Sequence, residues 1–288
     1  MRTVVAVTAL FLAACAPGAD DDVTTTTAAP TTTATTSPAN GSACLSGDLP
    51  FAASGPIAAI GGDSGDATVL AGIRWEAHEG CERVVMDFFN DAGAPASTVG
   101  PAGAIAFAES GVVRITLPPE VAASAVADSV LDGSLAQRAF VVRDANGALF
   151  VDIHVATDTA VEVRAFDVAS PIRLVVDLRP GSGTSLVIAE PSLADDTVVL
   201  APAAGAALYP LRVTGYARSD LAAIRVRIYQ AGAIALDRAV STIGPPDTWH
   251  SFDVRLADGP SGPVELYVGA VDAFEEPLGG VSIALELP

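Results

Sequence analysis

An all-β fold of two β-sandwich domains is predicted by three features of the sequence from residue 48 onward. Apolar and polar residues alternate with a period of two, which places successive side chains on opposite faces of a strand. Gly, Pro, Asp and Asn interrupt these runs as turn residues do. Amphipathic helical patterns are scarce, and residues 119–131 are the one stretch for which we expect a short helix.

Residues 1–14 are predicted to be a signal peptide. A short apolar run follows Met1 and Arg2 and ends in Leu12-Ala13-Ala14-Cys15. The run is far too short to span a bilayer, and its last four residues resemble the lipobox of bacterial lipoproteins. In that class the cysteine receives lipid once the signal peptide is removed. We therefore expect Cys15 to hold the chain on the outer face of the cell membrane, in an extracytoplasmic location. The alternative is an ordinary secretory signal with an incidental cysteine.

Residues 15–47 are predicted to form a disordered tether. The segment contains Asp20-Asp21-Asp22, repeated threonines and prolines that include Pro30 and Pro38, with almost no residue that could enter a core. Such a composition cannot offset the entropy lost on ordering. As a partly stiff coil the tether would hold the folded part on the order of 30 Å from the membrane.

The first folded domain is predicted over residues 48–182. Its clearest strands are expected at residues 112–117, 135–143, 149–155, 160–167 and 172–179. In one of them Leu149, Val151, Ile153 and Val155 share a face, and Asp152 and His154 share the other. Residues 144–147, Asp-Ala-Asn-Gly, predict a hairpin turn in which Asn146 and Gly147 supply positive φ angles.

Two predicted strands repeat one pattern of arginine, apolar, valine, apolar, aspartate, apolar: residues 83–88 and 173–178. In both, the alternate residues form an apolar face, and the charged residues share the opposite one. Antiparallel pairing would place Arg83 opposite Asp177 and Asp87 opposite Arg173. Each such cross-strand ion pair contributes a few tenths to about 1 kcal/mol.

These motifs carry a resemblance to a known family. His78-Glu79-Gly80-Cys81-Glu82-Arg83-Val84-Val85 and Pro171-Ile172-Arg173-Leu174-Val175-Val176-Asp177-Leu178 resemble the AMIN-like domain of actinobacterial envelope proteins, over about residues 66–180. The resemblance implies a β-sandwich that localises its protein to the cell envelope, in some members by binding peptidoglycan. The chain departs from the pattern at Cys81, where members tend to carry an aromatic, and at Glu82, where Asp is usual.

Besides Cys15 the chain has two cysteines, Cys44 and Cys81. In an oxidising compartment two such cysteines usually pair, and a disulfide closing a loop of this length stabilises a fold by about 3–4 kcal/mol on the chain-entropy model. The alternative is two separate thiols. Neither a histidine nor a third cysteine stands at zinc-ligand spacing, and we expect no metal and no cofactor.

The second domain is predicted over residues 189–288, after a short linker at residues 180–190. Seven strands are expected near residues 197–200, 208–217, 222–229, 233–242, 249–256, 263–271 and 281–287. The run Pro210-Leu211-Arg212-Val213-Thr214-Gly215-Tyr216-Ala217, then Trp249-His250-Ser251-Phe252, then the closing strand resemble the immunoglobulin-like domain of bacterial spore germination proteins (Gmad type). The resemblance implies a sandwich with no known catalysis.

The charge balance limits the range of partners. The chain has 34 acidic and 15 basic residues, a formal net charge of −19, and every basic residue is arginine. Such a surface repels nucleic acid and anionic lipid headgroups, and we expect no nucleic-acid partner.

An enzymatic interpretation starts from Gly62-Asp63-Ser64-Gly65. This segment resembles the nucleophile segment of trypsin-like proteases, but no histidine precedes Ser64. Ser64 together with His250 resembles the first and last blocks of SGNH esterases, which are α/β enzymes. Here the two blocks fall in separate predicted β domains, whereas a nucleophile and its base must lie within about 3 Å. We expect no catalytic activity and keep a serine esterase using Ser64 and His250 as a remote alternative.

The predicted function is a non-catalytic binding or scaffolding module of the cell envelope. It would contact cell-wall glycan, peptidoglycan in particular, or an envelope protein. The candidate binding residues are Trp75, His78, Arg83, Asp87, Arg173 and Asp177. Core packing is the alternative role of Trp75, and exposed strand or turn positions are the alternative for His78 and His154. The competing hypothesis is a regulatory accessory subunit of an envelope enzyme, without wall affinity.

Overall fold

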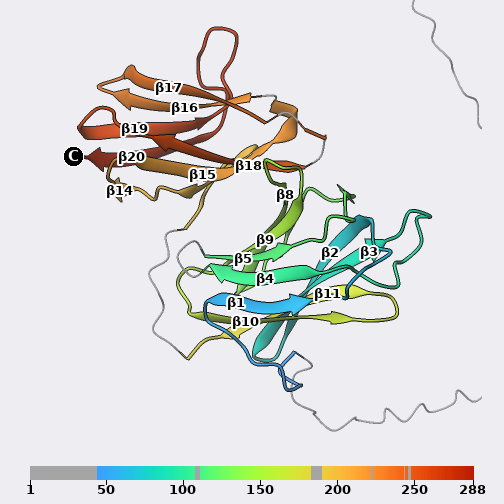
Figure 1. The fold of residues 1–288 in the computed structure, drawn as a ribbon. Helices are drawn as coiled ribbons and strands as arrows, with labels where there is room; N and C mark the ends of the chain where they lie inside the picture. Colours follow the sequence, from blue (N-terminus) through green and yellow to red (C-terminus); the bar gives the residue numbers. More distant parts are fainter. Residues whose placement is uncertain (1–43, 108–110, 183–189, 222, 243, 246–247) are drawn as a thin grey trace, which may run out of the picture. The chain divides into compact units, whose positions relative to one another are not determined.

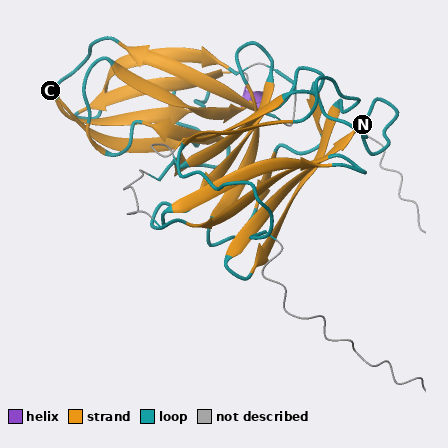
Figure 2. Ribbon diagram, turned by 60° about the horizontal axis from the view of Figure 1, so that its bottom comes forward, coloured by secondary structure: helices purple, strands orange, loops and turns teal. Residues whose placement is uncertain are grey.

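Strands make up nearly all of the regular structure in the computed structural model, which describes residues 44–107, 111–182, 190–221, 223–242, 244–245 and 248–288 (Figures 1 and 2). The all-β prediction is confirmed. The helix present in these ranges is a single 3₁₀ turn, Ser219–Leu221, and none of the described helical structure is long and apolar enough to cross a membrane. The predicted signal peptide, Cys15 and the tether up to residue 43 lie outside the described residues, as does most of the predicted linker.

One sheet has five strands, with the first copy of the repeated pattern at its centre. In spatial order they are β10 (Val161–Val168), β11 (Arg173–Pro180), β3 (Cys81–Phe89), β2 (Val69–His78) and β6 (Ala123–Ser124). β6 is short and pairs only with Val69 and Leu70. Along the rest of its length β2 is therefore an edge strand within the described part of the chain.

A second sheet has ten strands and contains residues of both predicted domains. Its order is β1 (Gly55–Ile60), β4 (Ala102–Phe107), β5 (Val112–Thr116), β9 (Leu149–Val155), β8 (Ala136–Arg143), β18 (Trp249–Leu256), β15 (Leu211–Arg218), β13 (Thr197–Ala201) and β12 (Ser192–Leu193), with β7 (Asp128–Val130) also paired to β8. β8 and β18 join in parallel at two positions, where Val142 lies beside Trp249 and Arg143 beside His250.

A third sheet belongs to the C-terminal part of the chain. Its order is β14 (Gly205–Ala206), β20 (Val281–Leu287), β19 (Gly262–Gly269), β16 (Ala223–Gln230) and β17 (Ala233–Ser241). Together with β13, β15 and β18 of the ten-stranded sheet, these strands confirm all seven strands expected beyond residue 189.

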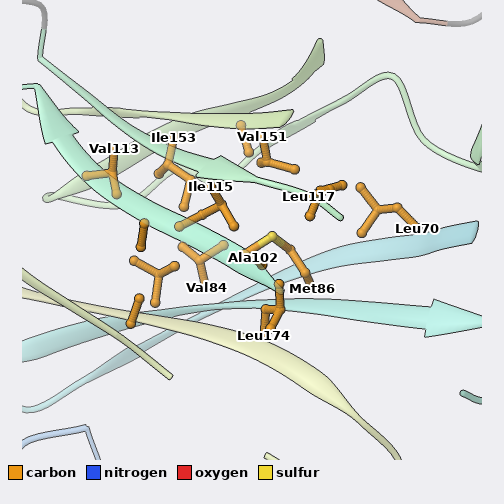
Figure 3. Close-up of a cluster of buried hydrophobic side chains, with 14 of the residues drawn as sticks. Leu70, Val84, Met86, Ala102, Val113, Ile115, Leu117, Val151, Ile153 and Leu174 are labelled. Atoms are coloured by element: carbon orange, nitrogen blue, oxygen red, sulfur yellow. The ribbon is translucent and has the colours of Figure 1, made fainter. Parts of the chain in front are cut away.

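Two large cores are each enclosed between sheets. The first lies between the five-stranded sheet and strands β4, β5, β8 and β9, as Figure 3 shows for Val84, Met86 and Ile115 among others. The second lies between the third sheet and strands β13, β15 and β18. Full burial of each Val, Leu, Ile, Met or Phe side chain contributes roughly 1.5–3 kcal/mol, so these faces hold the sheets together.

A smaller apolar cluster lies where β8 and β18 meet. It consists of Phe140, Val142, Phe150, Val198, Tyr216 and Trp249. The first three come from β8 and β9 and the others from β13, β15 and β18, so this cluster lies on both sides of the β8–β18 pairing and joins the two halves of the ten-stranded sheet. We call it the junction cluster.

The predicted pairing of the two repeated strands is confirmed. β3 and β11 are antiparallel neighbours, with Arg83 opposite Asp177 and Asp87 opposite Arg173. The alternate residues Val84, Met86 and Leu174 point into the first core, so the charged residues lie on the outer face of the five-stranded sheet. The pattern fixes this register because a shift by one residue would place the charges in the core.

Cys44 and Cys81 are joined by a disulfide bond, with their Cα atoms 6.2 Å apart. Cys44 is fully buried, and Arg164 Nη2 donates to the carbonyl oxygens of Cys44 (3.0 Å) and Ser46 (2.7 Å). Residues 44–47, predicted as the end of a disordered tether, are instead attached to β3 and β10. The disulfide is the pairing expected from the sequence. The tether prediction is wrong at these residues because its boundary was drawn from composition, without applying that disulfide to the chain around Cys44.

The helix expected at residues 119–131 is absent, and this segment forms β6 and β7 instead. The backbone N–H groups of Ala122 and Ala125 donate to the carbonyl oxygens of Thr68 and Leu70, at 3.1 and 2.9 Å. Pairing with the neighbouring sheet therefore satisfies groups that a helix would have paired within itself.

The hairpin turn predicted at residues 144–147 is confirmed between β8 and β9, but its conformation differs. Gly147 has a positive φ of 88°, as predicted, whereas the φ angle of Asn146 is not positive. The side chain of Asp144 shapes the turn instead, because its Oδ1 accepts hydrogen bonds from the N–H groups of Asn146 (2.8 Å) and Ala148 (2.9 Å).

Candidate binding cleft at the β2 edge

A shallow cleft of about 440 Å³ lies along β2, where this strand is at the edge of its sheet. Its lining residues come from β2, β3 and the β7 segment: Ile73, Arg74, Trp75, Glu76, Arg83, Val85, Ser129, Val130 and Leu131. We call it the β2-edge cleft. It brings together two of the predicted binding residues, Trp75 and Arg83, with an aliphatic wall that includes Val130, which is 62% exposed.

Charged groups of both signs line the cleft. The Arg74 side chain is 59% exposed and that of Glu76 is 74% exposed. Arg74 also donates two hydrogen bonds to Asp87, from Nε at 2.6 Å and Nη2 at 2.9 Å. This hydrogen bonding raises the pKa of Arg74 further above its usual value, so the guanidinium is a permanent cation at the cleft wall. It can hold a carboxylate or a hydroxyl oxygen of a ligand.

Arg83 is mainly engaged within the protein. Its guanidinium donates to both oxygens of Asp177, from Nε at 2.6 Å and Nη2 at 2.9 Å. Asp177 is fully buried, and on its other side Arg164 donates to Oδ2 from Nε (3.0 Å) and Nη2 (2.9 Å). These residues form a triad, Arg164–Asp177–Arg83, in register across β10, β11 and β3.

Asp87, at the other end of the same face, also lies between two arginines. Arg74 pairs with it, and Arg173 Nε lies 3.4 Å from its Oδ1. Each group contains two arginines and one aspartate, and therefore has a formal charge of +1 in a chain whose net charge is −19. The outer face of the five-stranded sheet is thus more cationic than the chain as a whole.

Arg164 and Arg74 were not among the predicted site residues. Arg164 lies directly opposite Asp177 across the β10–β11 hairpin, and Arg74 lies across the β2–β3 hairpin, beside Val85. Both arginines could have been found by counting residue pairs outward from each hairpin turn. Each lies directly across from the strand that carries the repeated pattern.

Trp75 lines the cleft and also packs against the first core. Its indole N–H donates to Glu82 Oε2 at 3.0 Å. Glu82, which is nearly buried, also accepts from the backbone N–H groups of Ser134, Leu135 and Ala136. Burial alone would raise the pKa of the Glu82 carboxyl, but these donors outweigh it and lower the pKa. Glu82 therefore orients Trp75 as a fixed carboxylate.

His78 ends β2, opposite Cys81. It is half-buried, and its Nε2 lies 3.6 Å from Glu76 Oε2. It does not line the β2-edge cleft, so the structure separates His78 from the residues that do.

A second cleft, of about 370 Å³, continues along β2 past Arg74 and Ile73, which line both. It is mostly apolar, with Phe89, Val126 and Ile172 among its lining residues. Gly72 faces this space, and a Cβ atom at that position would meet nothing within 4 Å. The two clefts together give the β2 edge an apolar end and a charged end.

The residues of the esterase alternative occupy different elements. Ser64 is exposed in the loop between β1 and β2, where Asp66 accepts hydrogen bonds from the N–H groups of Ser97 (2.9 Å) and Thr98 (2.7 Å). His250 lies on β18 opposite Ala217. Within the described ranges, none of the observed hydrogen bonds joins Ser64 to His250.

Polar groups also lie buried beside the junction cluster. Asp152 is fully buried, and Arg114 donates to both its oxygens, from Nε at 2.7 Å and Nη2 at 2.6 Å. The hydroxyl of Tyr216, on β15, donates to Asp152 Oδ2. Burial raises the pKa of Asp152, and it raises that of Tyr216 well above its usual value, so the phenol keeps its proton.

His154 is buried in the same region, with 3% of its area exposed, so the interpretation as an exposed strand residue is wrong. It lies opposite Arg138 and its ring centroid is 4.8 Å from that of Phe140. Burial, assisted by the charge of Arg138, lowers its pKa to about 4. His154 is therefore neutral in the folded protein at neutral pH.

This burial predicts a dependence of stability on pH. The unfolded chain binds a proton at His154 near pH 6.5, but the folded chain binds it only near pH 4. Between these values the unfolded state binds more protons, so the free energy of unfolding falls as the pH falls, by about 3 kcal/mol in total from this group.

The measurement is urea unfolding at pH 7 and pH 4.5 for the parent and for His154→Gln. We expect the loss of stability on acidification to be smaller by about 2–3 kcal/mol in the variant, since carboxylates titrate in both proteins. Equal losses in the two proteins would show that His154 does not carry the dependence.

No group of three or more His, Cys, Asp or Glu side chains is placed to hold a metal ion anywhere in the described ranges. Comparisons with known proteins add no name to this geometry. A scan of the chain against models of protein families finds no match, and a search of curated proteins finds none.

Proposed function

We propose that this chain is a non-catalytic binding module of the cell envelope, carried by lipid on Cys15, that contacts cell-wall glycan through the β2-edge cleft. The observation that carries the proposal is the composition of this cleft. It combines an exposed guanidinium, an exposed carboxylate, a half-buried indole and an aliphatic wall, contributed by Arg74, Glu76, Trp75 and Val130. Peptidoglycan offers hydroxyl groups, amides, stem-peptide carboxylates and apolar sugar faces, which match these groups in kind.

The domain assignment belongs to the same proposal. We assign residues 48–182 to an AMIN-like sandwich and residues 189–288 to an immunoglobulin-like sandwich of the Gmad type. The confirmed register of β3 and β11 supports the first assignment, because both motifs of the resemblance lie on these strands. The seven strands from β13 to β20, apart from the two-residue β14, support the second.

Co-sedimentation with purified cell-wall sacculi tests this function. The full chain is used as Cys15→Ser, which removes the lipid acceptor and with it any retention through lipid. We expect the protein to sediment with the sacculi, and we expect Arg74→Ala to weaken binding by about tenfold, since a charge-assisted hydrogen bond to a ligand contributes roughly 1.5 kcal/mol.

The control is Arg212→Ala. Arg212 is 69% exposed and pairs with Asp253, as Arg74 pairs with Asp87, so both variants remove one exposed, paired guanidinium. Retention unaffected by Arg74→Ala would refute the cleft as the site. A protein that stays in the supernatant would refute glycan binding and favour the regulatory accessory role.

A further inference from the structure

The loop between β19 and β20 presents two large apolar side chains to solvent. Phe274 is 85% exposed and Leu278 is 62% exposed. Phe274 is the more exposed of the two, and it lies far along the chain from the residues of the β2-edge cleft. Single exposed apolar residues are common on protein surfaces. Phe274 differs from these because of the hydrogen bonds that hold its loop.

The loop is held by its own hydrogen bonds. Asp272 Oδ1 accepts from the N–H groups of Phe274 (2.8 Å) and Glu276 (3.0 Å). The backbone of Asp272 also pairs with that of Glu276, and Leu278 N–H donates to the carbonyl of Ala270, both at 2.9 Å. The segment that carries Phe274 is therefore fixed on both sides.

The side chain of a buried arginine is hydrogen-bonded to the loop. Arg227, on β16, has 1% of its area exposed, and its Nε donates to Asp237 Oδ2 at 3.1 Å. Its other nitrogens reach Glu275, where Nη1 donates to the carbonyl oxygen and Nη2 to the carboxylate. Glu275 has a φ of 66°, a left-handed conformation that is unfavourable for a residue other than glycine and that the surroundings must impose.

These contacts fix the backbone that carries an exposed aromatic side chain. A binding residue that is already fixed loses little conformational entropy when it docks, and aromatic side chains seated in pockets are the usual anchors of protein interfaces. Rigid display of Phe274 is therefore the arrangement expected of an interface anchor, and not of a solvent-exposed loop residue that is free to fold away.

The charges around Phe274 define the partner. Asp272, Glu275 and Glu276 are within two residues of it. Glu275 is paired with Arg227, which leaves Asp272 and Glu276 as the nearest acidic groups beside it, and the chain as a whole has a net charge of −19. A second copy of this chain and an anionic lipid surface would both be repelled. A protein with an apolar pocket rimmed by lysine or arginine would be attracted.

We propose that Phe274 anchors a second interface of this protein, separate from the β2-edge cleft, for a partner protein that presents an apolar pocket with a basic rim. The loop from Ala270 to Gly280 supplies the contact, and the Arg227–Glu275 clamp holds it in the docking conformation. This interface does not depend on glycan binding, and it would connect a glycan-bound module to another protein.

The experiment begins with photo-crosslinking in the cells that produce the protein. p-Benzoylphenylalanine replaces Phe274 in the full chain, and a matched control carries it at Leu208, which is 73% exposed in the same half of the chain. We expect a crosslink to one protein from position 274 that position 208 does not give. The crosslinked protein is then purified and titrated against the full chain.

The affinity of the full chain for the purified crosslinked protein tests whether Phe274 is the anchor. We expect Phe274→Ala to weaken this binding by about 30-fold, as for an interface hot spot, and Leu208→Ala to leave it unchanged. Affinity should also fall with rising salt, and less steeply in Glu276→Gln. Equal affinity of Phe274→Ala and the parent for this protein would overturn the proposal. The crosslinking would also overturn it if position 274 were crosslinked only to lipid, only to a second copy of the chain, or to the same proteins as position 208. Circular dichroism verifies that the variants are folded.

Discussion

Replacing Asp177 by asparagine is expected to lower the free energy of unfolding by about 3–5 kcal/mol, the usual effect of removing one member of a buried ion pair. Asp177 is fully buried between Arg83 and Arg164, whose side chains are 23% and 4% exposed. Asparagine keeps the size of the side chain but removes the charge that both guanidinium groups require. Urea unfolding of the full chain at pH 7, followed by circular dichroism, measures the loss.

The matched control for this variant is Asp253→Asn. Asp253 also accepts hydrogen bonds from an arginine of a neighbouring strand, Arg212, but both side chains are more than half exposed. Water competes for such a pair, so we expect the unfolding midpoint to move within the error of measurement. A similar loss in both variants would show that burial is not the cause.

A triple variant separates uncompensated charge from lost packing. Replacing Arg83 and Arg164 by methionine together with Asp177→Leu removes all three charges and fills similar volume. We expect it to be more stable than Asp177→Asn alone, because buried ion groups are often replaceable by apolar ones. A triple variant less stable than the single one would mean that the hydrogen bonds to Cys44 and Ser46 dominate.

The second large effect is expected from Trp249→Ala. Trp249 is the largest fully buried side chain among the described residues, and it joins the junction cluster with its ring 5.0 Å from that of Phe140. Its indole N–H donates to Asp128 Oδ2 at 3.0 Å. Truncation leaves a cavity and removes one hydrogen bond to Asp128, which keeps its ion pair with Arg138 at 2.8 Å. The expected cost is about 3–5 kcal/mol, mainly from the cavity.

This variant should also alter cooperativity. The parent is expected to unfold in one transition, because the junction cluster and the β8–β18 pairing join both large cores. In Trp249→Ala we expect two separate calorimetric transitions, one for each core. Phe274→Ala is the control, since it removes an aromatic side chain that is 85% exposed and should change neither stability nor cooperativity. One transition at the parent temperature in Trp249→Ala would contradict the coupling.

The sequence predicts the fold well where a local pattern determines the structure. The repeated arginine and aspartate positions predicted the β3–β11 register correctly, because this register keeps the charges outside the core and also places each arginine opposite an aspartate. Alternation likewise placed Val151 and Ile153 in the core. The turn before Leu149 was located from Asn146 and Gly147, although Asp144 turned out to shape it.

The sequence failed where a face is covered by a distant part of the chain. Alternation assigned Asp152 and His154 to the same outer face correctly, but the pattern does not show that Tyr216 packs over this face. His154, for which an exposed position was expected, is therefore buried, and so is Asp152 beside it. The junction cluster has no local signal either, because its members are apolar residues that lie in ordinary alternating strands.

The candidate site was predicted in part. Trp75 and Arg83 do line one cleft, while Asp177 is buried beneath its arginines and His78 lies elsewhere. Arg74, the most accessible cation of the cleft, was missed because nothing in the repeated pattern marks it. Phe274 was missed for a different reason, since exposure of an aromatic residue in a loop has no signature in the sequence.

The disulfide at the beginning of the described chain has a mechanical consequence. A force applied to the chain before Cys44 is transmitted through the disulfide to Cys81 on β3. The backbone between Cys44 and β1 does not have to detach first. β3 is the middle strand of its sheet and is bonded to β2 on one side and β11 on the other. Tension would therefore be shared between two ladders of hydrogen bonds, and both would have to break before β3 leaves its sheet.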